Sequence, residues 1–165
     1  MSLTLPLLPP VWFWLAATSW ALLCALALPR VPWRLLSGGG RELHVVLGAT
    51  VAVALLWCLA GTPIAGLRIH LLGATALSLL MGAPLALLCG SLAVGISHLL
   101  WPHAAPLWPF ECLFGIAIPV GITQLLLALV RRHGPRNPYV YWLGVGFLGG
   151  GIGMCAHLLA WLLLA

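Results

Sequence analysis

The amino-acid sequence predicts an all-α membrane protein, a polytopic helical bundle with about six transmembrane segments. Hydrophobic residues make up 63% of the 165 positions and charged residues only 5%, whereas soluble domains carry about 25% charged residues. The mean hydropathy is +1.15. Apolar runs long enough to cross a hydrocarbon core alternate with short loops rich in Pro, Gly and Arg. Because no loop is long enough to form a second domain, we expect a single transmembrane domain, 1–165.

Proline and glycine set the expected ends of the apolar runs. The first run follows MSLTLPLLPP, which lacks the positive charge that precedes a signal peptide, so we expect a retained helix. Trp12, Trp14 and Trp20 crowd its first half, as in an interfacial aromatic belt. Pro29 ends this run, and Gly61-Thr62-Pro63 ends the second. The predicted segments are 11–28, 43–60, 69–81, 84–101, 111–130 and 139–165.

The third segment, 69–81, is short for a full crossing at about 1.5 Å of rise per residue. Gly82-Ala83-Pro84 follows it and predicts a break in the helix. Two arrangements fit this pattern. The third and fourth segments form a tight hairpin of two crossings, or together they form one broken or re-entrant element covered by protein or water.

The arginines predict the orientation. With six crossings, the loops on one side hold six of the seven arginines, and the other side holds Arg68. The positive-inside rule then places both termini outside, in what we expect to be a bacterial inner membrane. The net charge of +5 is therefore attributed to orientation and contact with membrane lipids, not to binding of nucleic acid. The six arginines are Arg30, Arg34, Arg41, Arg131, Arg132 and Arg136.

Titratable side chains within apolar sequence are functional candidates. This topology places four of the six histidines and one of the two glutamates at the outer side, with His44 and His133 at the inner side. Imidazole and carboxylate together suit divalent nickel, cobalt, copper or zinc. The alternative is that each histidine reaches the interface separately. The predicted metal ligands are His70, His98, His103, His157 and Glu111.

The five cysteines form no Cys-x-x-Cys pair and are interpreted as small buried hydrophobic residues. The cysteines of the outer half, together with Met154, would add soft sulfur ligands if the metal were copper. The sequence has no aspartate, phosphate-binding loop, His-Glu-x-x-His motif or nucleophile elbow. We therefore expect no enzyme and no built-in cofactor, and any ATP hydrolysis has to come from another subunit. The possible soft ligands are Cys58, Cys112, Met154 and Cys155.

The stretch 66–94 resembles the cobalt/nickel uptake permeases of energy-coupling-factor ABC transporters. The resemblance lies in His70-Leu71-Leu72-Gly73 entering a helix, then Leu- and Ala-rich sequence, then the Gly82-Ala83-Pro84 break. Asn137-Pro138-Tyr139, opening the last segment, is compatible with it. The resemblance implies a substrate-binding permease subunit that takes up cobalt or nickel, with an energy-coupling transmembrane subunit and ATPase subunits as partners.

In that family the metal is bound outside by the free N-terminus, a histidine at the second position and the helix-entry histidine. His70 matches the last of these. Residue 2 is Ser2, and no histidine precedes His44. Three alternatives follow: another outer histidine substitutes, the metal is different, or metal binding has been lost.

A hypothesis from another class is a non-transporting assembly subunit of a larger complex, whose histidines are merely interfacial. It would pack through the last segment, where Gly146/Gly150 and Gly149/Gly153 are small-xxx-small pairs. A third hypothesis is a membrane enzyme or haem carrier that uses paired histidines. No single segment contains two histidines at a spacing that would support it.

Overall fold

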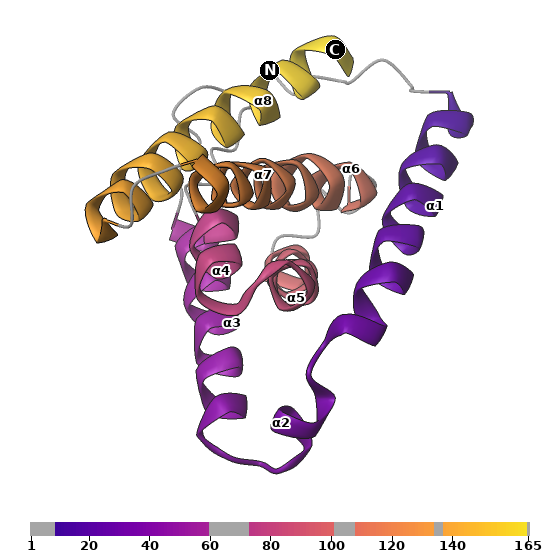
Figure 1. Cartoon of the computed structure of the whole chain (residues 1–165). Helices are drawn as coiled ribbons and strands as arrows, with labels where there is room; N and C mark the ends of the chain where they lie inside the picture. The colour runs from indigo at the N-terminus through magenta and orange to yellow at the C-terminus, as the bar shows by residue number, and fades with distance from the viewer. Residues whose placement is uncertain (1–8, 60–72, 101–107, 134–136, 165) are drawn as a thin grey trace.

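A computed structural model of the chain describes residues 9–59, 73–100, 108–133 and 137–164. Every secondary-structure element in these ranges is helical, which confirms the all-α prediction (Figure 1). The elements are α1 (Pro10–Ala27), η1 (Leu28–Arg30), α2 (Trp33–Ser37), α3 (Arg41–Leu59), α4 (Gly73–Met81), α5 (Ala83–Leu100), α6 (Trp108–Cys112), η3 (Leu113–Ala117), α7 (Ile118–His133), η4 (Val140–Leu148) and α8 (Gly149–Leu164).

Four helical stretches of the described chain are long and apolar enough to cross a membrane. Their outward faces carry large apolar side chains, among them Leu22 at 61% exposure, Leu99 at 82% and Leu125 at 62%. Such extensive exposed apolar surface marks a membrane protein. The stretches are Pro10–Arg30, Ala83–Leu100, Trp108–His133 and Leu143–Ala160.

The second and third predicted segments correspond to α3, of 19 residues, and α4, of nine. Neither is among the four stretches above. At about 1.5 Å per residue, α4 rises about 14 Å, roughly half of the hydrocarbon thickness. The beginning of the predicted third segment, 69–72, lies outside the described residues.

The predicted break between the third and fourth segments is confirmed. Gly82 has φ of +81°, a left-handed conformation that favours glycine. Its N–H donates to the Ser78 carbonyl at 3.0 Å, which closes α4, and its own carbonyl accepts the Ala86 N–H at 3.0 Å, which opens α5. Pro84 lies in the first turn of α5, where a missing N–H is tolerated.

Close contacts at glycines show how the helices pack. A Cβ on Gly73 of α4 would lie 2.9 Å from Val53 of α3, and one on Gly90 of α5 would lie 2.8 Å from Ile116 of η3. A Cβ on Gly153 of α8 would lie 3.2 Å from Pro119 of α7, so the Gly149/Gly153 pair allows the close approach that its spacing predicts.

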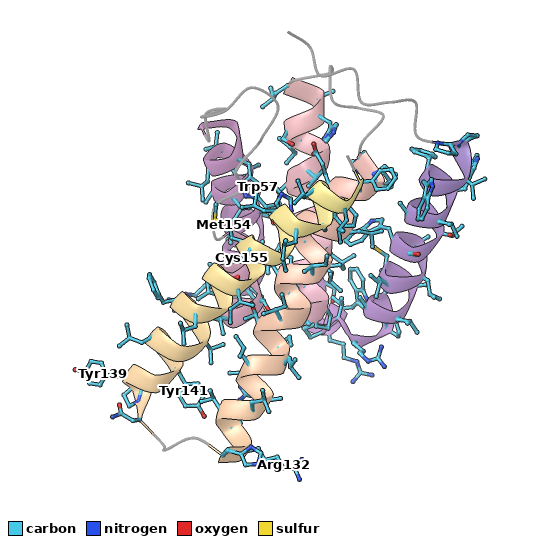
Figure 2. All side chains as sticks on the ribbon, turned by 90° about the horizontal axis from the view of Figure 1, so that it is seen from above. Trp57, Arg132, Tyr139, Tyr141, Met154 and Cys155 are labelled. Carbon is cyan, nitrogen blue, oxygen red and sulfur yellow. The ribbon has the colours of Figure 1, made fainter. Side chains whose placement is uncertain are left out.

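These contacts make successive helices alternate in direction. The start of α4 lies against the last turns of α3, and the start of α3 lines a cavity with Met81 and Leu85 beside the α4–α5 turn. Figure 2 shows the start of α1 and the end of α8 toward one end of the molecule and Arg132 at the other. Arg30 and Arg34 flank Pro32, which lines the same cavity as Arg41 beside the α4–α5 turn. Helix α7 runs toward this end as α4 does, because Thr75 and Ser78 of α4 contact Thr123 and Gln124 of α7 in the same order.

The helix from Trp108 to His133 contains a π-helical stretch, η3. The Ile118 N–H donates to the Leu113 carbonyl, five residues back. Pro119 explains the wider turn, because its ring would clash with the Gly115 carbonyl in a regular α-helix. This stretch supplies Ile116 to the core and brings Phe114 and Gly115 next to α8.

Candidate functional site at the end opposite the arginines

His98 and Glu111 lie together at the end of the molecule opposite the arginines. His98 is in the last turn of α5 and Glu111 is in α6. The His98 Nε2 atom is 3.5 Å from the Glu111 Oε2 atom, and the two side chains are 9% and 6% exposed. The structure thus brings together two of the predicted ligands from segments that the intervening residues, 101–107, separate in sequence.

The contact of the other imidazole nitrogen, Nδ1, determines which ring nitrogen of His98 carries the proton. His98 Nδ1 is 2.9 Å from the Val94 carbonyl oxygen. A carbonyl only accepts, so Nδ1 carries a proton. In neutral His98 the Nε2 lone pair then points toward the Glu111 carboxylate. The two groups can share a proton or hold a cation, the arrangement in which a histidine ligand is oriented through its second nitrogen.

The spacing is compatible with joint ligation of one ion. A divalent ion about 2.1 Å from each atom would make an N–metal–O angle of about 110° across the 3.5 Å separation. That angle is close to tetrahedral. The pair therefore offers two ligands of the predicted type, one nitrogen and one oxygen, in a buried position.

His157 of α8 is 5% exposed and packs against the helix that contains Glu111. Its ring packs over Gly115, where an added Cβ would be 3.9 Å from His157 Cε1, and its side chain hydrogen-bonds to the backbone of Phe114. Phe114 and Gly115 follow Glu111 by about one helical turn. His157 is thus at the predicted end, held by the π-helical stretch.

The predicted ligand set is only partly assembled among the described residues. His70 and His103 lie outside them. Within the described ranges, no group of three or more His, Cys, Asp or Glu side chains is arranged to hold a metal ion. His44 and His133, predicted at the opposite side, are exposed at the start of α3 and the end of α7. A third ligand from His70 or His103 stays a prediction.

The cysteines occupy different environments. Cys89 and Cys112 belong to the buried core, as predicted, at 2% and 0% exposure. Cys24 hydrogen-bonds to Ser91, and Cys89 to Thr50. Cys155 is exposed on α8, next to Met154 (Figure 2), so it does not share the core position of Cys112. The side chain of Cys58 lies outside the described residues.

A second polar cluster, between α4 and α7, escaped the sequence analysis. Gln124 Nε2 donates to Ser78 Oγ at 2.8 Å, and the Thr123 and Thr75 hydroxyls are 3.3 Å apart. The Thr123 hydroxyl also lies 2.7 Å from the Pro119 carbonyl, so it can donate to Pro119 or to Thr75. Thr75 and Ser78 lie three residues apart on one helical face, which is the signal that could have revealed them.

Comparison with known proteins adds no relative, since no family model, curated protein or solved structure matches the chain. What defines the molecule is accordingly its own architecture: a helical membrane protein with a buried histidine–glutamate pair at the end opposite its arginines.

Proposed function

We propose that this chain is a membrane permease subunit that binds a divalent transition metal ion for uptake, energised by separate ATPase subunits. The buried His98–Glu111 pair is the observation that carries the proposal. The resemblance of 66–94 to cobalt/nickel permeases points to cobalt or nickel as the ion, with copper or zinc as the other ions that such ligands suit.

The energetics of the pair favour a functional origin. Removing two charged groups from water costs more than their attraction returns in many buried pairs, and apolar replacements often stabilise a protein. Ionisable groups in membrane-spanning helices are accordingly rare and associated with ion pathways or proton relays. Because stability alone does not favour His98 and Glu111 at this depth, a ligand-binding role is the simplest reason for their presence.

The entry into α4 supports His70 as a further ligand. Gly73, three residues after His70, packs tightly against Val53 and Trp57 in the last turns of α3. Since α4 and α5 run in opposite directions from Gly82, the start of α4 lies on the same side of that turn as His98, although the nine residues of α4 reach only about half as far as the 18 of α5. The chain therefore enters α4 on the side where the pair lies.

The proposed orientation places the arginine end in the cytoplasm and both termini outside, in a bacterial inner membrane. Metal would bind at the outer end and be released inside when the helices reorient. No nucleotide-binding motif occurs in the sequence, so an energy-coupling transmembrane subunit and ATPase subunits are the proposed partners.

Metal-dependent thermal unfolding of the purified protein tests this function. We expect nickel or cobalt to raise the midpoint of the wild type, and of His44→Ala as a control far from the pair. The Glu111→Gln variant, which keeps the shape of the side chain but loses its charge, should respond much less. Equal midpoints with and without every metal in the wild type would contradict the proposal.

The competing function is a non-transporting assembly subunit. It would co-purify with a large complex and show no response to metal. The exposed apolar face of the last segment, with Phe147 at 73% exposure and Ile152 at 48%, is its best support. Gly149 and Gly153 are less available to it, because they pack inside the chain against α7.

A further inference from the structure

The end that carries the arginines also has a cavity of about 370 Å³, between α2, the start of α3 and the α4–α5 turn. Pro32 and Leu36 contribute one wall, Val45 another, and Leu80 and Leu85 the third. Arg41 lies at the cavity together with Glu42. The cavity is thus apolar along its walls and charged at one edge.

The charge around this edge is strongly positive. Arg30, Arg34, Arg41, Arg131 and Arg132 are all exposed at this end. Glu42 is the single acidic side chain there, since Glu111 is the only other one in the sequence. The Glu42 Oε2 atom is turned back toward Gly40, 3.1 Å from the position of a Cβ, where the start of α3 favours a negative charge.

No carboxylate lies within ion-pair distance of Arg34 or Arg41 among the residues that the structure describes. The protein therefore does not neutralise these guanidinium groups itself. An anion from the surroundings is the complementary partner, and at a membrane surface the abundant anions are lipid phosphates.

Trp33 indicates the depth of the cavity relative to the membrane. Its side chain is 50% exposed, and its indole N–H donates to the Leu28 carbonyl at 2.8 Å. Tryptophan is enriched at the level of the headgroups. Since Trp33 lies between Pro32 and Arg34, the charged edge falls at headgroup level, and the apolar walls extend toward the hydrocarbon.

We propose that this cavity binds an anionic phospholipid. Its phosphate contacts the Arg41 guanidinium, and one acyl chain lies along Val45, Leu80 and Leu85. This acyl chain would extend along the side chain of Leu80, which is 76% exposed. Bound lipid would pack against the residues that precede the left-handed Gly82, and so hold the α4–α5 turn.

Lipid retention measured by native mass spectrometry tests the proposal. The full chain is purified in detergent and exposed to phosphatidylglycerol or to phosphatidylcholine with the same acyl chains. We expect the wild type to retain one phosphatidylglycerol in preference to phosphatidylcholine. In Arg41→Gln, binding should be roughly fivefold weaker, the effect of one basic contact at an anionic surface.

Two matched variants separate a site from general charge attraction. Arg132→Gln removes the same charge at the same end but away from the cavity, and should retain lipid like the wild type. Val45→Trp fills the cavity without changing the charge and should displace the lipid. Equal retention by Arg41→Gln and Arg132→Gln would overturn the proposal.

The source of the phosphate is tested in the same instrument. Glycerol phosphate, which has no acyl chain, should not displace the bound phosphatidylglycerol. Its displacement at equal concentration would contradict a lipid site. Failure of the wild type to retain any phosphatidylglycerol would likewise overturn the proposal.

Discussion

His98 depends on two neighbours, one for each ring nitrogen. The Val94 carbonyl, one turn earlier on α5, holds Nδ1, and Glu111 of α6 faces Nε2. The first contact is local and follows from helical geometry. The second joins two helices, because it places the Glu111 carboxylate 3.5 Å from the Nε2 atom of His98.

Removing the imidazole alone should be costly. We expect His98→Ala to lower the free energy of unfolding by about 3 kcal/mol, because the buried Glu111 carboxyl then loses the imidazole that faces it. The double variant His98→Met with Glu111→Met, which removes both titratable groups, should recover most of this loss. Reversible unfolding in mixed detergent measures both, and His44→Ala serves as an exposed control. An equal cost for His98→Ala and His44→Ala would show that the pair does not couple.

Among the described glycines, Gly90 has the closest neighbour to an added Cβ. A Cβ at this position would lie 2.8 Å from Ile116, whereas one at Gly95, on the same helix, meets nothing within 4 Å. We therefore expect Gly90→Ala to destabilise the protein by about 1–3 kcal/mol through overpacking. Gly95→Ala should be neutral or slightly stabilising, since alanine favours helix over glycine. The same unfolding measurement compares them, and the reverse order would contradict the α5–η3 contact.

The positions of single residues could be predicted from the sequence where they depend only on the direction of each helix. Alternating helices were enough to assign His98, Glu111 and His157 to one end. The direct contact of His98 with Glu111 was not predictable, because it depends on how α5 and α6 pack. The Thr75–Thr123 and Ser78–Gln124 contacts were missed for the same reason: each residue alone is unremarkable in an apolar helix.

At the scale of the elements, helix ends were predictable because Pro and Gly mark them. Pro29 lies in η1 just after α1, and Gly82 ends α4, as expected. The π-helical stretches η3 and η4 were not predicted. A π-turn differs from an α-turn in which carbonyl each N–H meets, and apolar periodicity carries no such information. Only Pro119 hinted at an irregular turn.

The polar contact between α4 and α7 should contribute measurably to stability. In a double-mutant cycle with Ser78→Ala and Gln124→Leu, we expect a coupling energy of about 0.6–1.7 kcal/mol, the range for hydrogen bonds between membrane helices. Ser91→Ala replaces Ser78→Ala in the control cycle, since the Ser91 hydroxyl bonds to Leu87 of its own helix at 2.6 Å. Additive effects in both cycles would mean that the Ser78–Gln124 hydrogen bond does not couple α4 to α7.

At the scale of the molecule, the arginines that the structure describes and the histidine–glutamate pair lie at opposite ends. The arginine end contains the last turn of α7, with Arg131 and Arg132, and the start of α3, with Arg41. The other end contains His98, Glu111 and the beginning of α1. This separation is the structural counterpart of the charge asymmetry in the sequence. The positive-inside rule then predicts that the end with these arginines faces the cytoplasm.

Site-directed labelling tests the orientation. In a background without native cysteines, Ser37→Cys should react from the cytoplasmic side only. Ala104→Cys, in the segment that connects α5 to α6, should react from the opposite side, because α5 leaves the arginine end and α6 returns toward it. Membrane-impermeant maleimide applied to intact cells and to inverted vesicles distinguishes the two. Labelling of both positions from one side would contradict six alternating segments.

Isothermal titration of the purified protein with nickel, cobalt, copper and zinc tests the central claim, a metal-binding permease subunit, most directly. We expect the wild type and His44→Ala to bind one ion with equal affinity. His70→Ala and Glu111→Gln should each weaken binding by at least about tenfold, or about 1.4 kcal/mol, without loss of helical content. Absence of binding by the wild type, or equal binding by all four proteins, would contradict the account.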